Sequence, residues 1–437
     1  MRHLVFCSIC CLTALLISSC NGTEPAPAAP SSAIRAVNER EIPSGTATLA
    51  IIHPQIITGD GETVISDGCV LIENDRISAV GPYGSIDLPA DIETIDATGM
   101  TLVPGFVDAH FHLNRMDSLP TLFLQNGVTS VRDPGAWIED FESERASGRP
   151  MPRLFLTGPH IDMFPPAYPT NSFVVRDALE ARAAVQQFAD QGASGIKIYF
   201  KSSLEIIRAT CESAHAIGIP VTAHLEITDI YQAVDQGLDG IEHITSLGYN
   251  LVSPIEAENY KQAILHDTNA RRLGRYRMWE HIDPNGAEAT RLGRFLAEKG
   301  IFVCPTLDAF EYQPTPEQTD TLRLTAFERM LQYTRVLHEL GVAVVVGSHG
   351  WVKYAAKDAS FQHEMELLEK SGIPPLAILH AGTLLNARFL GIADRLGSIE
   401  AGKMADLVLV SGDPLQGITA LRRVERVMLA GKWVDRK

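Results

Sequence analysis

The sequence predicts an α/β protein with a (β/α)8 TIM barrel at its centre and a small β-sandwich built from the N- and C-terminal segments. Two observations predict this fold. Eight short apolar runs alternate with helical stretches through the middle of the chain, which is typical of βα units on a parallel sheet. Shorter β-like runs lie near both ends. A chain of 437 residues, 45% of them hydrophobic, is long enough for such a barrel.

The N-terminus has the pattern of an export signal. Arg2 precedes an apolar run, Leu4 to Ile17, and Ser18-Ser19-Cys20 follows it. A short basic start, an apolar stretch too short to span a bilayer comfortably, and small residues at its end are typical of a signal peptide. The ending resembles a bacterial lipobox, in which the cysteine becomes the lipid-modified first residue. The alternative is an ordinary signal peptide with an incidental cysteine.

We therefore expect four parts along the chain. They are a signal peptide (1–19), a lipid-anchored tether (20–45), a composite β-sandwich (46–100 and 400–437) and a metal-dependent barrel (101–399). The tether contains a stretch rich in Pro, Ala and Ser, which is typical of a flexible linker. The expected location is the bacterial cell envelope, with the membrane contacted through a lipid on Cys20.

The β-like runs at the two ends are short and bounded by turn residues. They are Thr48 to Ile57, Gly68 to Glu73 and Arg76 to Val80 near the start, and Asp406 to Val410, Val424 to Leu429 and Lys432 to Val434 in the tail. Neither group is long enough to bury its own face well. We therefore expect the two groups to pair with each other in one small sheet.

The eight central runs are the candidate barrel strands. They are Thr101 to His110, Val128 to Arg132, Arg153 to Thr157, Gly195 to Phe200, Pro220 to His224, Gly240 to Ile244, Ile301 to Pro305 and Val342 to Gly347. Helices are expected at Asp177 to Gln191 and at Leu204 to Ile217, the latter ending before Gly218. A doubly wound open sheet is the alternative, but no GxGxxG motif follows the first run.

Two bulk features limit the partners and the cross-links. The net charge is −16 and no basic cluster could follow a phosphate backbone, so nucleic acid is not an expected partner. Cys69, Cys211 and Cys304 are widely spaced in the chain, which does not indicate a disulfide framework.

The segment from Thr245 to about Arg291 is too long for a simple connection, and it is either a lid over the barrel mouth or a solvated insertion. The oligomeric state stays open, a homo-oligomer included.

Several residues of metal-ligand type fall at the carboxyl ends of the predicted strands. His110 and His112 end the first run, and alternation along a strand sends both imidazoles to one face. Lys197 lies inside an apolar strand, while His224 and His243 close the next two. Taken singly, each histidine could bond a neighbouring carbonyl, and Lys197 could pair with a buried acid. Five such residues at strand ends of one barrel favour a metal centre.

Three longer motifs show a family resemblance. They are Leu102 to His112 (LVPGFVDAHFH), Gly127 to Asp133 (GVTSVRD) and Gly397 to Val408 (GSIEAGKMADLV). From about Ala47 onwards the chain resembles the amidohydrolase superfamily, near its imidazolonepropionase-like and Xaa-Pro dipeptidase-like branch.

The resemblance implies a site and a chemistry. His110 and His112 would bind the more buried metal, and His224 and His243 the second. Lys197, carboxylated by CO2, would bridge the two divalent ions. Zinc suits these ligands, although manganese, cobalt and iron are alternatives. The implied activity is hydrolysis of an amide, peptide or cyclic amide bond in a small-molecule substrate by a metal-activated water.

His349 departs from the family pattern. The resemblance implies an aspartate after the eighth strand, as metal ligand and proton shuttle, whereas this chain reads Gly347-Ser348-His349-Gly350. Either His349 replaces the aspartate as ligand or base, or the site keeps one metal, or hydrolysis is lost. We favour the first, because the other five positions are intact. A neutral imidazole can both ligate a metal and move protons near neutral pH.

Other classes fit less well. The sequence has no GxSxG elbow and no P-loop GxxxxGK[ST] motif. The alternative from a different class is a catalytically altered or inactive lipoprotein that binds a small ligand or a partner in the barrel mouth. His160 is either a further pocket histidine or a surface one.

Overall fold

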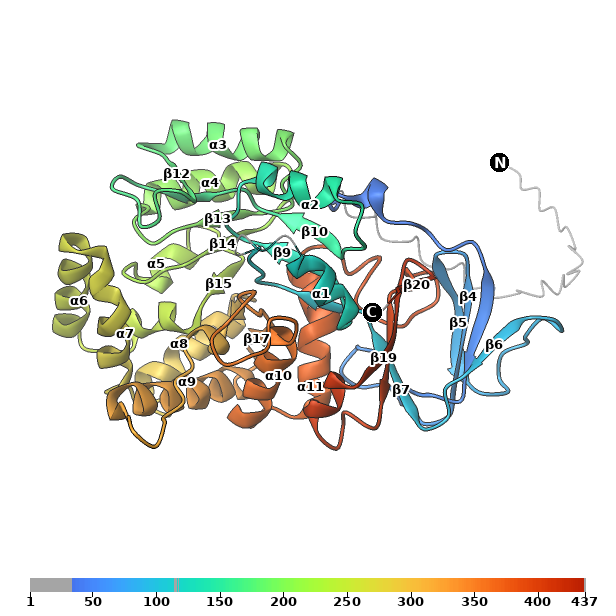
Figure 1. Cartoon of the computed structure of the whole chain (residues 1–437). Coiled ribbons are helices and arrows are strands. Elements are labelled where there is room, and N and C mark those ends of the chain that lie inside the picture. The colour runs from blue at the N-terminus through green and yellow to red at the C-terminus, as the bar shows by residue number, and fades with distance from the viewer. Residues whose placement is uncertain (1–33, 114–115, 117, 436–437) are drawn as a thin grey trace, which may run out of the picture. The chain divides into compact units, whose positions relative to one another are not determined.

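The structure is a computed structural model, and it describes residues 34–113, 116 and 118–435 (Figure 1). The expected signal peptide, Cys20 and the first part of the expected tether lie outside the described residues. Within the described ranges, no helix is both long enough and apolar enough to cross a membrane. The three cysteines found there, Cys69, Cys211 and Cys304, are free and buried.

Parallel strands form the centre of the fold. A three-stranded sheet has the order β10-β9-β8, and a seven-stranded sheet has the order β12-β11-β13-β14-β15-β16-β17. Their bounds are β8 Phe106–Asp108, β9 Val128–Asp133, β10 Arg153–Leu156, β11 His160–Asp162, β12 Ser172–Val174, β13 Ile196–Ile198, β14 Val221–Ala223, β15 Gly240–Glu242, β16 Phe302–Cys304 and β17 Ala343–Val344. Most of these strands are buried along their whole length, as expected for a sheet covered on both faces.

Backbone hydrogen bonds link the two parallel sheets at two places, one between β10 and the residues before β13 and one between the residues after β8 and those after β17. Ser194 N donates to Leu156 O (2.8 Å), and Ala109 N donates to Val346 O (3.0 Å). The sheets are not one continuous ladder, so the described architecture is α/β and TIM-barrel-like. Each of the eight predicted runs contains a strand of these sheets, and β11 and β12 are two additional strands that the sequence did not predict.

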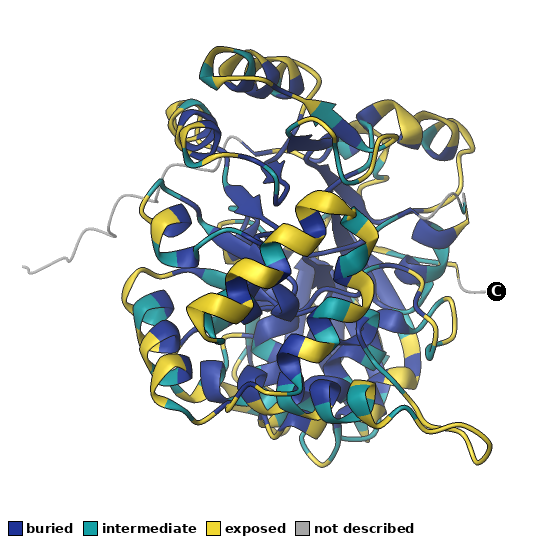
Figure 2. Ribbon diagram, turned by 90° about the vertical axis from the view of Figure 1, so that its left-hand side faces the viewer, coloured by how far each residue is buried: buried dark blue, intermediate teal, exposed yellow. Residues whose placement is uncertain are grey.

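Twelve α-helices are described, and most lie around the parallel strands (Figure 1). Their bounds are α1 Leu119–Gln125, α2 Glu142–Ala146, α3 Ala178–Asp190, α4 Leu204–Ala216, α5 Ile230–Val234, α6 Pro254–His266, α7 Arg271–Trp279, α8 Ala287–Glu298, α9 Thr321–Glu339, α10 Ser360–Ser371, α11 Pro375–His380 and α12 Asn386–Phe389. Figure 2 shows the strands buried inside, while many helices have exposed outer faces. Amphipathic helices covering a buried parallel sheet explain the alternating pattern in the sequence.

The two helices predicted with explicit bounds are confirmed to within one residue at each end. Asp177 caps α3, because its side chain accepts hydrogen bonds from the backbone N–H groups of Leu179 and Glu180. Helix α4 ends before Gly218, which has φ +76°, a conformation that glycine adopts without strain.

The strand predicted at Thr101 to His110 is two strands. Strand β7 (Met100–Pro104) pairs with β18 (Leu407–Ser411), outside the parallel sheets, and only β8 joins β9. The break falls at Gly105, where a Cβ atom would lie 2.3 Å from Thr129 Oγ1. The chain passes from one sheet to the next at this position, and the close approach to Thr129 leaves room only for glycine.

Two further sheets contain the terminal strands. One has four strands, β5-β4-β1-β6, and the other has six, β20-β19-β18-β7-β2-β3. The bounds not yet given are β1 Thr48–Ile52, β2 Gln55–Ile57, β3 Val64–Ile65, β4 Gly68–Glu73, β5 Arg76–Pro82, β6 Glu93–Asp96, β19 Val424–Leu429 and β20 Lys432–Trp433. Both sheets contribute to one apolar cluster that includes Ile51, Val70, Leu102 and Leu407.

The six-stranded sheet unites the two ends of the chain, as predicted, but the expectation of a single sheet was wrong. The run Thr48 to Ile57 bends at His53, which has φ +66° and is followed by Pro54. Strand β1 therefore joins the four-stranded sheet and β2 the six-stranded one. A proline lacks the N–H that a continuous strand would need at that point.

Candidate metal centre

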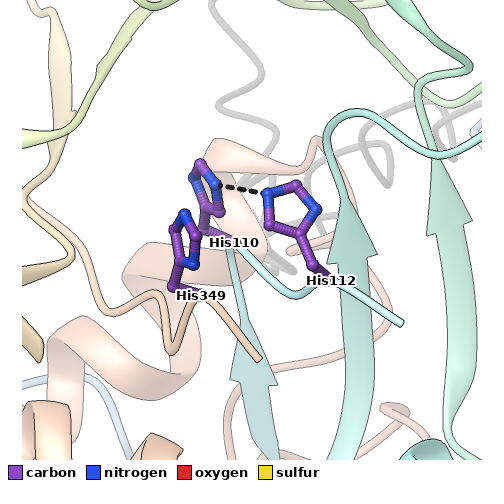
Figure 3. A group of neighbouring side chains, drawn as sticks. All are labelled: His110, His112 and His349. Carbon is purple, nitrogen blue, oxygen red and sulfur yellow. Dashed lines mark hydrogen bonds between the residues drawn. The ribbon is translucent and has the colours of Figure 1, made fainter. Parts of the chain in front are cut away.

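His110 and His112 lie just beyond β8 with their rings turned toward each other (Figure 3). His110 Nδ1 is 2.7 Å from Glu242 Oε2, and His112 Nδ1 is 3.1 Å from Asp133 Oδ1. A carboxylate accepts the Nδ1 proton in each case, which leaves Nε2 as the ring nitrogen with a free lone pair. The two Nε2 atoms are 3.2 Å apart.

His349 supplies the third imidazole of this group. Its ring is stacked on that of His110, with centroids 5.3 Å apart and an angle of 14°, and it meets the His112 ring edge-on at 4.9 Å. Its backbone N–H donates to His110 O (2.6 Å), and its φ is +54°. One ring nitrogen from each of the three histidines lies within 4.8 Å of the others. The three rings therefore form one compact group of potential ligands.

A buried pair fixes the backbone on both sides of this group. Asp108 accepts hydrogen bonds from Ser348 N (3.0 Å), Ser348 Oγ (2.5 Å) and His110 N (3.0 Å). Because Asp108 precedes His110 by two residues and Ser348 precedes His349 by one, this pair ties the end of β8 to the loop after β17. The positions of His110 and His349 are thereby coupled.

The donor set fits a divalent cation. Zn–N bonds of about 2.0–2.1 Å at tetrahedral angles put two ligand nitrogens about 3.3 Å apart. The His110 and His112 Nε2 atoms are 3.2 Å apart, close to that separation. With both Nδ1 protons directed at carboxylates, two nitrogen lone pairs face each other, and a cation between them removes their repulsion. Buried neutral imidazoles are the form that metals bind.

The three other predicted site residues surround this group at longer separations. They are Lys197, His224 and His243. Lys197 is buried in the middle of β13, and His224 and His243 follow β14 and β15. The His243 ring centroid is 4.7 Å from that of His110 and 4.5 Å from that of His224. His243 Nδ1 is 2.7 Å from Thr306 Oγ1. The six predicted residues are thus neighbours, but only His110, His112 and His349 form the tight group.

Lys197 has a buried acid beside it. Its Nζ lies 3.7 Å from Glu242 Oε1, and Arg132 Nη1 lies 2.7 Å from the same oxygen. Burial, opposed by Glu242 and reinforced by Arg132, lowers the pKa of Lys197 to about 8. The amine is therefore more easily deprotonated than that of an ordinary lysine.

Burial also keeps the imidazoles neutral. It lowers the pKa of His349 to about 3, with His112 and Lys197 adding to the effect, and lowers that of His224 to about 4. The pKa values of His110 and His243 are held well below 6.5, chiefly by burial. At neutral pH these four rings are in the form that binds a cation.

Sequence reasoning missed the carboxylates that orient the rings. Glu242 and Asp133 are buried at strand ends and hold His110 and His112, and Glu226 lies 2.6 Å from His224 Nε2. The signal was available, because an acidic residue within or next to an apolar strand needs a partner. Glu242 stands directly before His243, and Asp133 ends the second motif.

A cavity of about 700 Å³ opens onto the centre. It is lined by His110, His112, Leu113, Asp133, Gly135, Ala136, Trp137, Asp140, His160, Tyr168, Thr170, Asn171, Lys197, Tyr199, His243 and His349. His160, whose place was open from the sequence, is one of its buried walls, with its ring 4.7 Å from that of Tyr199. The volume suits a small molecule, and both polar and aromatic groups face it.

The chain has relatives among known proteins. Residues 101–434 match the sequence profile described as the amidohydrolase family. An adenine deaminase from Brucella suis is 24% identical over 86% of this chain, and the chain spans 54% of that protein's length. An imidazolonepropionase from an Arthrobacter strain is 43% identical over 68 residues, which are 15% of this chain and 16% of that protein.

Solved structures have the same fold. A proposed prolidase from Bifidobacterium longum has a TM-score of 0.68 and 27% identity, covering 89% of this chain and 95% of that one. A Xaa-Pro dipeptidase with methionine bound in its active site also has a TM-score of 0.68, at 22% identity, covering 89% of this chain and all of that one.

Proposed function

Because the chain belongs to the amidohydrolase family, we propose that it is a metal-dependent hydrolase of carbon–nitrogen bonds in small molecules, acting on amide, peptide or cyclic amide groups through a metal-activated water. The observation that carries the proposal is the group of three imidazoles. His110, His112 and His349 each bring a ring nitrogen within 4.8 Å of the others at the wall of a 700 Å³ cavity. Zinc suits such a donor set.

The proposed ligand atoms follow from the hydrogen bonds. His110 and His112 would bind through Nε2, since a carboxylate occupies each Nδ1. His243 would also bind through Nε2, because its Nδ1 is bonded to Thr306, and His224 through Nδ1. We propose that Lys197 is carboxylated, because its lowered pKa favours the neutral amine that reacts with CO2.

The chain's own residues prepare the reaction. A bound divalent ion lowers the pKa of a water molecule and polarises a carbonyl. Glu242 and Asp133 hold two rings in one orientation, which reduces the reorganisation needed during catalysis. His349 is proposed to replace the family's aspartate as ligand or base. Its pKa of about 3 makes it a weak proton acceptor, which favours the role of ligand.

Metal content together with a substrate screen tests the function. Purified protein is analysed for divalent ions by mass spectrometry and then incubated with N-acyl amino acids, prolyl dipeptides and lactams. One or two bound ions with turnover support the hydrolase. A protein without metal that binds such compounds unchanged supports the alternative, a catalytically altered family member that binds a ligand. The alternative is favoured by His349, which stands where the family resemblance implies an aspartate.

The location and the finer architecture are also proposals. The apolar run Leu4 to Ile17 followed by Ser18-Ser19-Cys20 supports lipid anchoring at Cys20 in the cell envelope. Labelling with radioactive palmitate, lost in Cys20→Ser, would support it. The linking bonds at Ser194 and Ala109 support a closed (β/α)8 barrel, and the shared apolar cluster supports a small β-sandwich of the two terminal sheets. A crystal structure tests both.

A further inference from the structure

The long connection between β15 and β16 contributes side chains to the surroundings of the metal centre. It contains a 3-10 segment, Ile244–Asn250, followed by α6 and α7 (Figure 1). Tyr260 on α6 and Arg275 on α7 are both buried. The side chains of both approach Glu226, a fully buried carboxylate two residues after His224.

Both oxygens of Glu226 are occupied, and by different parts of the chain. Oε2 accepts a hydrogen bond from His224 Nε2 at 2.6 Å. Oε1 accepts a hydrogen bond from the Tyr260 hydroxyl and lies 3.5 Å from Arg275 Nε. The carboxylate therefore connects the histidine to the two helices of the connection.

This arrangement selects one tautomer of His224. A carboxylate that accepts from Nε2 keeps the proton on that nitrogen, so Nδ1 carries the lone pair. Among the described residues Nδ1 is buried and has no hydrogen-bond partner. A buried acceptor without a partner is unfavourable unless something binds it. The ring lies 4.5 Å from that of His243, within the candidate metal centre.

We propose that Glu226 is a positioning residue, held by Tyr260 and Arg275, that fixes His224 with Nε2 protonated and Nδ1 presented as a ligand atom for a second divalent cation. The cation part of this inference rests on the proposed function, whereas the tautomer part does not. An ordinary buried ion pair between Arg275 and Glu226 would explain their charges but not the unpartnered Nδ1. The connection then has a role that the sequence did not predict, because it supports a ligand.

Glu226→Gln tests the inference, because the amide has one acceptor where the carboxylate has two. Tyr260 donates a hydrogen bond to Oε1 and the Arg275 guanidinium lies beside the same oxygen, so the amide oxygen takes that place and the amide NH2 faces His224. Two donors would then meet at Nε2, and the proton moves to Nδ1. Glu256→Gln is the matched control. It makes the same change on α6, the helix that carries Tyr260, at an exposed capping-box position where glutamine also functions.

Two measurements report the result. Long-range ¹H–¹⁵N spectra of metal-free, histidine-labelled protein give the tautomer of His224, assigned by its loss in His224→Gln. Equilibrium dialysis against buffered Zn²⁺ gives the number and affinity of bound ions. We expect the proton to move from Nε2 to Nδ1 in Glu226→Gln and the second-ion affinity to fall about 10- to 100-fold. The first ion, and both readouts in Glu256→Gln, stay as in the wild type.

The outcomes separate this inference from the proposed function. An unchanged His224 tautomer in Glu226→Gln overturns the positioning role. A switched tautomer in a protein that retains no divalent ion supports the positioning role but overturns the proposed function and the cation part. If Glu226→Gln does not fold, Tyr260→Phe removes one hydrogen-bond donor to Glu226 and keeps the ring. We then expect the affinity for the second ion to fall by less than about tenfold. Tyr276→Phe on α7, whose hydroxyl bonds Phe310 O instead, is its control.

Discussion

The Nε2 atoms of His110 and His112 lie 3.2 Å apart, and a buried carboxylate holds each ring from its Nδ1 side. This relationship organises the candidate site before any ion arrives. The rings need not rotate to bind, because Glu242 and Asp133 already set their tautomers and directions. Changes to these partners should therefore alter cation binding more than they alter the fold.

Asp133→Asn should weaken cation binding through His112. The Asn oxygen can still accept from His112 Nδ1, Gly135 N and Ala136 N, but the negative charge is lost and the amide NH2 faces Leu113 N–H. We expect the Zn²⁺ affinity to fall about 10- to 100-fold in a competition titration. Asp177→Asn is the control, because it makes the same change at the cap of α3. Equal affinities in both variants would contradict the role of Asp133.

His349→Asp restores the residue that the family resemblance implies. If the position acts as ligand and base, kcat/KM on a substrate found by screening should be preserved or should rise, since a carboxylate can do both. His349→Ala should lower ion content. Complete loss of turnover in His349→Asp with full ion content would instead show that the imidazole has a role of its own.

Lys197→Met tests the bridging role. A buried methionine avoids the unfavourable burial of a charge, and Glu242 keeps its contact with Arg132, so we expect no loss of folding stability. The ion content should fall, from two to one where two are bound. We expect a ¹³C carbamate resonance in wild type prepared with ¹³C bicarbonate and none in Lys197→Met. A wild type without that resonance would contradict carboxylation.

The sequence predicted the repeating part of the fold well, because each βα unit carries its own local pattern. Helices α3 and α4 begin at side-chain caps, and the strands β4 and β19 are short apolar runs bounded by turn residues, so local sequence fixes their bounds. The prediction failed where tertiary contacts determine which residues form a strand. The separation of β7 from β8 depends on Gly105 lying against Thr129, and β11 and β12 are three-residue strands with no pattern of their own.

In the candidate site too, contacts between residues close in the sequence could be predicted and contacts between distant residues could not. His110 and His112 are two residues apart in the sequence, so their proximity is local, although both lie beyond the end of β8 and not on the strand. Glu242 reaches His110 across 132 positions, and the Ser348 bond to Asp108 spans 240. Such pairs depend on the order of strands in space, which one sequence does not give. The connection at 245–291 was left undecided for the same reason.

Removing the metal should lower the stability of the whole protein. An ion that binds only the folded state at 1,000 times its Kd adds about 4 kcal/mol. Dialysis against a chelator should therefore lower the thermal midpoint, and adding back Zn²⁺ should restore it. Differential scanning calorimetry with a Mg²⁺ add-back as control measures this. A midpoint that is unaffected by chelator and Zn²⁺ would contradict a structural contribution of the ion.

His363 should make stability depend on pH. His363 lies on α10. Its Nε2 is 2.7 Å from Glu311 Oε2, and its Nδ1 is 3.7 Å from Glu366 Oε2. The hydrogen bond to Glu311 and the nearby Glu366 carboxylate raise the pKa of His363 from 6.5 to about 9. Because the folded value is the higher one, the stabilisation is fully present below pH 6.5 and is lost as the pH rises through 9. At about 1.4 kcal/mol per pKa unit, its upper limit is about 3 kcal/mol.

His363→Gln isolates this contribution, since glutamine keeps a neutral donor at the position but cannot titrate. We expect the difference in urea midpoint between wild type and variant to be largest at pH 6 and to shrink steadily up to pH 9.5. Titrating groups that do not interact with His363 are common to both proteins and cancel in the difference. His215→Gln is the control, because His215 is exposed and its pair with the half-buried Asp239 is more strongly screened. Parallel curves for wild type and His363→Gln over this range would show that the pair does not stabilise the fold.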